Sequence, residues 1–183
     1  MRTLPWPDFI PELKTERLVL RPLGLDDAPD VAALFSDPAV TRFIDLDPMG
    51  SVADARAAIA EVLTAQENQR AMRWAIRVGA SNELAGTVGL LNISARNGRA
   101  ELGYDLGRAY WGRGLAREAA AEVVDYGFDA MGLHRIEADV QAENKASIAV
   151  LEKLGFRYEA DLHDYLFMKG SYHDVRRYYL LSS

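Results

Sequence analysis

A change of hydrophobic period in the middle of the chain constrains the fold more than any other feature. Three successive runs, residues 73–78, 84–93 and 99–106, alternate apolar and polar side chains, which is typical of strands. Residues 113–131 then adopt the spacing of an amphipathic helix, and residues 135–140 alternate again. Because strand–helix–strand crossovers are right-handed and join parallel strands, we expect the strand at 99–106 to run parallel to the strand at 135–140.

Weaker patterns complete the order of elements. The other predicted elements are a strand at 17–23, helices at 26–35 and from Ser51 onward, a helix at 145–154, and closing strands at about 157–168 and 174–181. The sequence therefore predicts an α/β (α+β) fold with a mixed central sheet of about seven strands flanked by helices. The predicted order is β-α-α-β-β-β-α-β-α-β-β.

The length of 183 residues, without an internal repeat or a Ser/Gly-rich linker, predicts a single domain over residues 1–183. Residues 1–14 are expected to form an N-terminal extension. No apolar run approaches the roughly 18 residues that span a bilayer, and the first residues lack the apolar region of a signal peptide. We therefore expect a cytoplasmic protein without a membrane partner.

Charge and cysteine content exclude several functional classes. The chain has 21 basic and 27 acidic residues, a net charge of -6, which argues against a nucleic-acid partner. It has no cysteine, so a thiolate metal site and a cysteine nucleophile are both impossible. The three histidines, His134, His163 and His173, lack the spacing of metal ligands, and we predict no metal.

Three glycines precede the central helix, in the segment from Gly107 to Ala116. A nucleotide-binding P-loop would need Lys and Ser/Thr where Arg113 and Gly114 stand, and a dinucleotide-binding loop would need glycine in place of Arg117. Unpaired N–H groups at a helix start still suit a pyrophosphate. The alternative is that the glycines only make a tight strand-to-helix turn.

Motifs along nearly the whole chain carry a resemblance to a known family. They are TERLVLRPL from residue 15, AELGYDL from residue 100, WGRGLAREA from residue 111, ENKASIAVLEKLGF from residue 143 and KGSYHDVRRYYLL from residue 169. In this order, from about Thr15 to Leu181, they resemble the GCN5-related N-acetyltransferase (GNAT) superfamily, and more narrowly its RimJ/RimL branch. The resemblance implies the GNAT fold and an acetyl-CoA-dependent N-acetyltransferase.

The resemblance also assigns a coenzyme site. The family's Q/RxxGxG/A motif falls on Trp111, Gly112, Arg113, Gly114, Leu115 and Ala116, whose backbone amides would hold the pyrophosphate of coenzyme A. Trp111 departs from the usual Gln or Arg, so a polar side-chain contact is lost there. The strand through Asp105 and Leu106 would pair its backbone with the pantetheine amides.

Two catalytic residues are expected from the same comparison. Glu101 matches a glutamate that serves as general base in several members, although it could equally be a solvated acid paired with an arginine. Asn144 would contact the pantetheine arm and Ser147 would donate a proton to the leaving thiolate, although both also suit a helix cap or packing. Leu151 stands where many members carry a tyrosine acid, so that mechanism does not transfer.

The acceptor is a primary amine whose identity the sequence leaves open, since residues 43–69 contain no substrate motif. A protein α-amine has a pKa about 2.5 units below that of lysine, so presenting it neutral costs roughly 3.5 kcal/mol less. We therefore expect direct transfer to a protein N-terminus in a ternary complex. The alternatives are a small-molecule amine (polyamine, amino acid or antibiotic) and a non-catalytic coenzyme A-binding module, in a monomer or a homodimer.

Overall fold

The computed structural model describes residues 3–182, apart from the side chain of Ala80, so residues 1–2 and 183 of the predicted domain lie outside it. The strands are β1 (Leu13–Lys14), β2 (Leu18–Pro22), β3 (Met72–Val78), β4 (Glu83–Ser94), β5 (Arg99–Leu106), β6 (Arg135–Val140), β7 (Arg157–Met168) and β8 (Ser171–Leu181). The helices are α1 (Ala28–Phe35), α2 (Val52–Glu67), α3 (Leu115–Asp129) and α4 (Lys145–Lys153).

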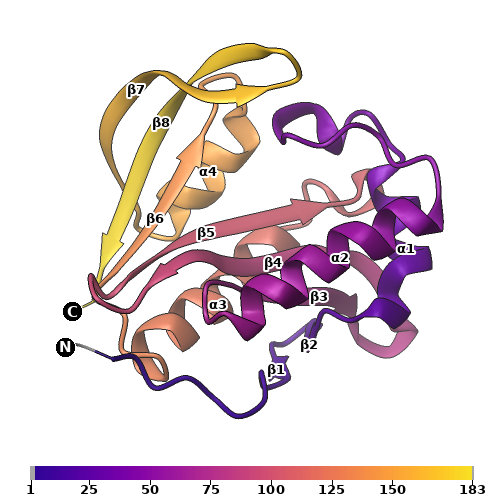
Figure 1. Ribbon diagram of the computed structural model, residues 1–183, viewed down its shortest axis with the longest axis horizontal. Helices are drawn as coiled ribbons and strands as arrows, with labels where there is room; N and C mark the ends of the chain where they lie inside the picture. The colour runs from indigo at the N-terminus through magenta and orange to yellow at the C-terminus, as the bar shows by residue number, and fades with distance from the viewer. Residues whose placement is uncertain (1–2, 183) are drawn as a thin grey trace.

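All strands join one mixed sheet in the order β1-β2-β3-β4-β5-β6-β8-β7 (Figure 1). The pairing of β5 with β6 is parallel and the other neighbours are antiparallel, which confirms the predicted crossover through α3. The sheet has one strand more than the predicted seven, because Leu13 and Lys14 pair with Leu20 and Val19 of β2. The expected N-terminal extension thus contributes an edge strand.

Helices cover both faces of the sheet (Figure 1). One buried cluster joins α3 and α4 to the sheet, and a second joins α1 and α2 to its other face. Trp74 on β3 is fully buried in the first cluster, and its Nε1 donates to the carbonyl of Pro11 at 2.8 Å. Trp74 is therefore a core residue.

Helix α3 begins at Leu115, two residues later than the periodicity suggests. Gly112 and Gly114 have φ angles of +71° and +77°, a left-handed conformation that L side chains rarely adopt, so the chain cannot be helical before residue 115. The helical spacing of apolar residues does not reveal this, because it records burial and not backbone conformation. The closing strand β8 likewise begins at Ser171, before the predicted residue 174.

Candidate active site

The sheet opens between β5 and β6. The two strands pair only through Arg99–Glu101 on β5 and Arg135–Glu137 on β6. Beyond that point β6 stays with β8, whereas β5 continues to Leu106 with β4 as its only partner, and the strands diverge (Figure 1). An extended ligand that carries amides can therefore add to the open edge of β5 over residues 102–106.

The open edge leads toward residues 112–116, which comprise the turn before α3 and the first two residues of the helix. We call this segment the phosphate loop. Gly114 is the N-cap of α3 and provides no side-chain cap, so the first N–H groups of the helix lack a capping side chain. A Cβ at Gly112 would meet no atom within 4 Å, so a ligand can approach the backbone there. The arrangement suits the pyrophosphate of coenzyme A.

Trp111 takes a position that the sequence did not indicate. Its indole Nε1 donates to the carbonyl of Leu106 at 2.7 Å, and its ring is about half exposed. The side chain therefore braces the end of β5 against the phosphate loop. The contact uses one lone pair of the Leu106 carbonyl, so an added ligand strand has only the other lone pair available there.

Glu101 lies at the point where β5 and β6 separate, and it is half-buried. Its Oε2 accepts a hydrogen bond of 2.8 Å from Nδ2 of Asn92, which sits at a β-bulge of β4 with a φ of +48°. The bulge turns the Asn92 side chain toward the carboxylate. Sequence reasoning missed Asn92, and the only signal was one asparagine inside an apolar strand pattern.

The surroundings raise the pKa of Glu101 above its ordinary value. Burial is the largest cause, and repulsion from Asp139 and Glu137 adds to it, while the Asn92 hydrogen bond and the charge of Arg177 oppose it. Asp139 is itself held by Arg177 at 2.6 Å, which limits its repulsion. A carboxylate with a raised pKa is a stronger base, as proton removal from an amine requires.

Ser147 in the first turn of α4 is paired with Tyr104 of β5, a contact that the sequence did not indicate. The hydroxyls of Tyr104 and Ser147 lie 2.7 Å apart, and burial raises the pKa of Tyr104 to about 12. Asn144 accepts a hydrogen bond from the backbone N–H of Ser147 at 3.2 Å, so it caps α4. Its amide NH2 group makes no hydrogen bond within residues 3–182 and can still contact a ligand.

The two expected catalytic residues lie on opposite sides of β5. Glu101 points toward the face that carries α1 and α2, whereas Tyr104, with Ser147, belongs to the face that carries α3 and α4. The open edge of β5 lies between them. A thioester placed along that edge would have a base on one side and a hydroxyl on the other. Leu151 is buried in the core at 1% exposure and cannot provide an acid there.

The side chain of Asp105 makes structural contacts in addition to the backbone role expected for this residue. It forms a part-buried ion pair with Arg73 and accepts a hydrogen bond of 3.5 Å from the hydroxyl of Thr87. Burial raises its pKa, and Arg73 opposes the shift. The side chain stabilises the pairing of β3, β4 and β5, while the backbone remains part of the open edge.

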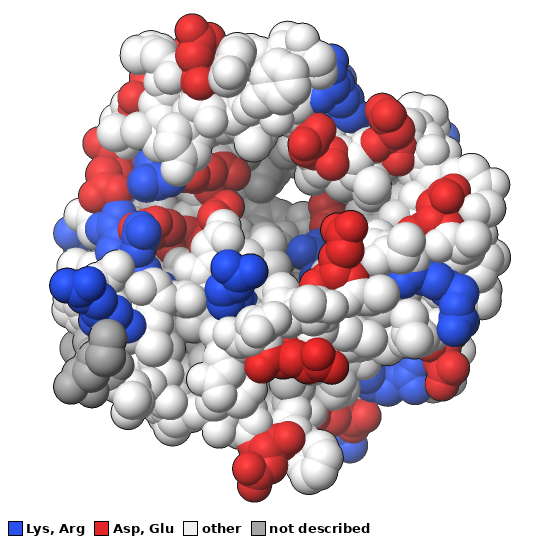
Figure 2. Space-filling view, in the orientation of Figure 1, with Lys and Arg blue, Asp and Glu red and all other residues white. Residues whose placement is uncertain are grey.

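The tip of the β7–β8 hairpin reaches across to the segment between α1 and α2. Lys169 Nζ donates to the carbonyl of Thr41 at 2.6 Å, and its backbone N–H donates to Asp45 at 3.3 Å. Figure 2 shows the surface hollowed between this hairpin and the helical side of the molecule, with acidic side chains on both sides of the hollow. An amine that approaches as a cation meets a complementary surface there.

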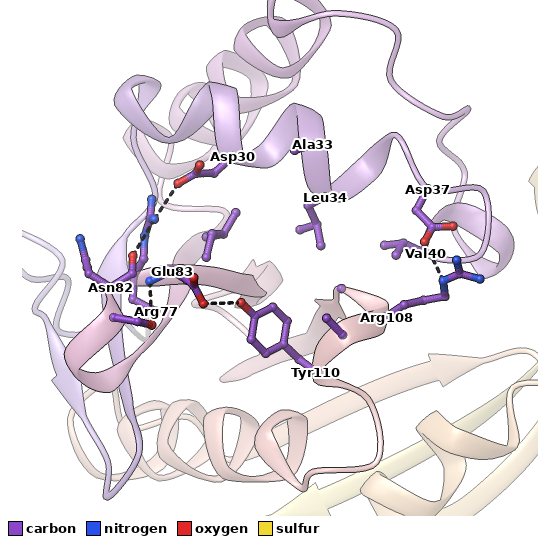
Figure 3. Close-up of a pocket in the computed structure, with 14 residues that line it drawn as sticks. Asp30, Ala33, Leu34, Asp37, Val40, Arg77, Asn82, Glu83, Arg108 and Tyr110 are labelled. Atoms are coloured by element: carbon purple, nitrogen blue, oxygen red, sulfur yellow. Dashed lines mark hydrogen bonds and ion pairs between the residues drawn. The ribbon is translucent and has the colours of Figure 1, made fainter.

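A separate cavity of about 750 Å³ lies between α1, the β3–β4 turn and residues 107–110 (Figure 3). Its three acidic side chains are all engaged: Asp30 with Arg77 at 2.7 Å, Asp37 with Arg108 at 2.9 Å, and Glu83 with the hydroxyl of Tyr110 at 3.2 Å. None of the expected catalytic residues lines it. We therefore place the active site at the opening between β5 and β6.

Among residues 3–182, no group of three or more His, Cys, Asp or Glu side chains could hold a metal ion. No helix within the same range is long and apolar enough to cross a membrane.

Comparisons with known proteins agree with this geometry. A family model described as "Acetyltransferase (GNAT) domain" matches residues 17–157. The chain belongs to the GNAT acetyltransferase family. It is therefore an N-acetyltransferase with acetyl-CoA as its co-substrate, and the expected family, fold and enzyme class are confirmed.

Individual relatives cover nearly the whole chain. An uncharacterized N-acetyltransferase, p20, of Bacillus licheniformis is 43% identical over 92% of this chain and 95% of its own. The spermidine N(1)-acetyltransferase of Escherichia coli K12 is 30% identical over 86% of this chain and 82% of its own. The structure of Mycobacterium smegmatis RimJ in complex with a CoA disulfide has a TM-score of 0.85 at 26% identity, covering 98% of this chain and 90% of that one.

Proposed function

We propose that this acetyltransferase moves the acetyl group of acetyl-CoA directly to the α-amine of a protein N-terminus. The observation that carries the proposal is Glu101, a carboxylate with a raised pKa at the point where β5 leaves β6. A base at that point faces the thioester of a coenzyme whose pyrophosphate rests on the phosphate loop. The acceptor enters from the hollow beside the β7–β8 hairpin.

The coenzyme side of the site binds and orients the donor. The backbone amides of residues 113–116 hold the pyrophosphate, and the backbone of Asp105 and Leu106 pairs with the pantetheine arm. The amide of Asn144 contacts the same arm from the start of α4. These contacts fix the position of the thioester, and placement of this kind supplies much of the rate enhancement in a two-substrate transfer.

Glu101 and Ser147 then carry the proton transfers. Glu101 removes the amine proton, directly or through a water, while Asn92 holds its carboxylate toward the acceptor. The amine nitrogen forms the new amide bond as the carbon–sulfur bond of the thioester breaks. Ser147, whose hydroxyl is held by Tyr104, donates a proton to the leaving thiolate or binds the water that does so.

Transfer in a ternary complex follows from the residues available. The chain has no cysteine to form an acetyl-enzyme, and donor and acceptor meet on the two sides of one strand edge. Initial-rate lines measured at several fixed acceptor concentrations should therefore intersect. Parallel lines together with a trapped acetyl-enzyme competent for transfer would rule out the direct mechanism.

The choice of an α-amine rests on the strength of the base. An α-amine is about 2.5 pKa units less basic than the lysine side chain, so a single carboxylate deprotonates it with roughly 3.5 kcal/mol less free energy. The neighbouring acids Asp139 and Glu137 are already paired with arginines and add no second base. With the same base, a lysine-type amine costs that much more free energy to present in its neutral form.

An acceptor screen tests the proposal, following thiol release from acetyl-CoA. One peptide should carry a free N-terminus and no lysine, and its matched partner an N-terminal block and one internal lysine. We expect release with the first and little with the second. Preference for the second peptide, or for no peptide at all, would contradict the α-amine assignment while leaving the acetyltransferase class intact.

A small polyamine is the second candidate acceptor. The observations that favour it are the acidic side chains on both sides of the hollow and the 30% identity with a spermidine N(1)-acetyltransferase. The same screen should include spermidine, amino acids and aminoglycosides. Higher kcat/KM with spermidine than with the free N-terminal peptide would favour this candidate.

A further inference from the structure

A cluster of side chains joins β2 to the start of α3, next to the phosphate loop. Arg17, just before β2, forms an ion pair of 2.5 Å with Glu118 in the first turn of α3. Glu118 also accepts hydrogen bonds from the Thr15 hydroxyl at 2.5 Å and the Arg17 backbone N–H at 2.9 Å. The Glu118 carboxylate thus binds the start of α3 to residues 15–17, about a hundred positions earlier in the chain.

Arg17 also reaches into the phosphate loop itself. Its Nη1 donates a hydrogen bond of 3.0 Å to the carbonyl of Arg113. Its Nη2 lies 3.6 Å from the position that a Cβ would take on Gly114. The guanidinium therefore binds the carbonyl of Arg113 and lies beside Gly114, on the β2 side of the loop.

The contact of Arg17 with the Arg113 carbonyl also determines where the N–H of Gly114 points. In a trans peptide the carbonyl of one residue and the N–H of the next point in opposite directions, and the described chain has no cis bond. Since the Arg113 carbonyl points toward Arg17, the N–H of Gly114 points away from it. That N–H makes no hydrogen bond within residues 3–182, so it is available to an anion on the outer side of the loop.

The charge of Glu118 and its hydrogen bonds hold the half-exposed guanidinium of Arg17 in place. Glu118 is only 18% exposed, and although burial alone would raise its pKa, the Thr15 and Arg17 hydrogen bonds lower the pKa below its usual range. It therefore stays ionised and keeps its partner. Because the planar guanidinium has donors in a fixed fork, one side chain satisfies Glu118 and the Arg113 carbonyl together.

We propose that Arg17 is a positioning residue for the coenzyme, which sets the Arg113–Gly114 peptide so that the N–H of Gly114 faces the pyrophosphate. This inference rests on the proposed coenzyme site and adds a residue from outside the family's loop motif. Arg17 acts through the loop and not as a cation on the phosphate. Removal of the Arg17 donors should leave the fold in place. It should weaken the binding of the phosphate portion of coenzyme A and leave the binding of the pantetheine portion unchanged.

The test compares a ligand with phosphates to one without. Arg17→Met keeps the aliphatic stem and removes both donors, so we expect coenzyme A, followed by calorimetry, to bind about 3- to 10-fold more weakly. Pantetheine, which has no phosphate, should bind the variant as it binds the wild type in an NMR titration. Arg56→Met on α2, where the arginine is exposed, is the matched control and should change neither ligand.

Two further variants separate positioning from other roles. Arg17→Lys retains the charge but not the fork, so affinity for coenzyme A should stay low; recovery would show a direct charge contact and overturn the proposal. Glu118→Gln retains the acceptor oxygen for Thr15 and should give a smaller loss of affinity than Arg17→Met. If Arg17→Met does not fold, Glu118→Gln still tests the proposal. Wild-type affinity of Glu118→Gln for coenzyme A would contradict it.

The outcomes distinguish this inference from the proposed function. Failure of the wild type to bind coenzyme A would overturn the coenzyme site itself. Binding by the wild type with equal affinity in Arg17→Met would overturn only the role of Arg17. Equal weakening of coenzyme A and pantetheine would show a general structural contribution and would also contradict positioning.

Discussion

The two halves of the proposed active site are built in different ways. The coenzyme half consists of the open edge of β5 and the phosphate loop, which are continuous in sequence and act mainly through backbone groups. The acceptor half consists of the β7–β8 hairpin and the segment between α1 and α2. These are joined by Lys169 and Thr41, which lie 128 residues apart. Glu101 lies where the two halves meet.

This difference determines how each half should tolerate substitution. A site made of backbone N–H groups depends on φ angles, so glycine replacements should affect it strongly and most side-chain replacements weakly. A site made of contacts between distant surface segments depends on particular side chains, each of which contributes little. The predictions below test this contrast, beginning with the residue between the halves.

Glu101→Gln should have the largest effect. The replacement keeps the shape and the Asn92 contact but removes the proton acceptor, so kcat should fall on the order of 10² to 10⁴ fold. Affinity for acetyl-CoA should change little, because in the proposed site the coenzyme is held by the phosphate loop and the β5 backbone and not by Glu101. Steady-state kinetics over a range of pH, together with calorimetry, measure both quantities.

The control for Glu101→Gln is Glu61→Gln, an exposed glutamate on α2 that should leave kcat unchanged. Asp105 would be a poor control, because its loss leaves the mostly buried Arg73 without its carboxylate partner and destabilises the sheet. A Glu101→Gln enzyme with nearly normal kcat and the wild-type pH profile would show that the amine is deprotonated elsewhere.

Gly114→Val should have the next largest effect, on the coenzyme half alone. The φ of +77° is strained for valine, and the branched side chain would stand beside the loop N–H groups, so we expect acetyl-CoA to bind about 10- to 100-fold more weakly. Gly132→Val at the other end of α3, where φ is +63°, imposes a similar strain outside the site. Equal loss of coenzyme affinity in both variants would mean that the loop is not the binding site.

The coenzyme half could be predicted from the sequence because its information is local. The spacing of Gly112 and Gly114 before an amphipathic helix is visible in the printed residues, and so is the alternation that places Glu101 on β5. The parallel crossover follows from chain connectivity. What remained hidden was the start of α3, which depends on backbone conformation, and the two-residue strand β1, which is too short to show a period.

The partners of the site residues could not be predicted, because pairing across the sheet depends on register and on bulges. Asn92 reaches Glu101 only because β4 bulges between Leu91 and Ser94. The alternation placed Tyr104 on the strand face opposite to Glu101, but its contact with Ser147 depends on where α4 packs. The contact of Lys169 with Thr41 depends on the three-dimensional path of two distant segments, and neither segment has a sequence pattern that predicts it.

Asn92→Gly should shift the pH dependence with a moderate loss of rate. Glycine accepts the φ of +48° without strain and removes the hydrogen bond that favours the ionised carboxylate, so the pKa of Glu101 should rise further. A base works only when deprotonated, and activity is lost as pH falls through its pKa. The acidic limb of the kcat/KM profile should therefore move to higher pH.

Asn82→Gly is the matched control for Asn92→Gly, since Asn82 has a φ of +55° in the turn between β3 and β4. It should leave the acidic limb where it is in the wild type. A shift of the limb to lower pH in Asn92→Gly, or no shift, would show that Asn92 does not stabilise the ionised form of Glu101.

Lys169→Met should have the smallest effect and should be confined to the acceptor half. The variant keeps most of the side-chain length but loses the Nζ donor to Thr41, so the hairpin tip is held to the α1–α2 segment only through the backbone contact with Asp45. Because a partly exposed polar contact of this kind contributes on the order of 1 kcal/mol, we expect KM for the acceptor to rise about 2- to 5-fold. Acetyl-CoA affinity and the pH profile should not change, and Lys14→Met, an exposed lysine on β1, should change none of these values. If Lys169→Met weakened acetyl-CoA as much as the acceptor, the hairpin would be coupled to the phosphate loop, and the two halves would not be independent.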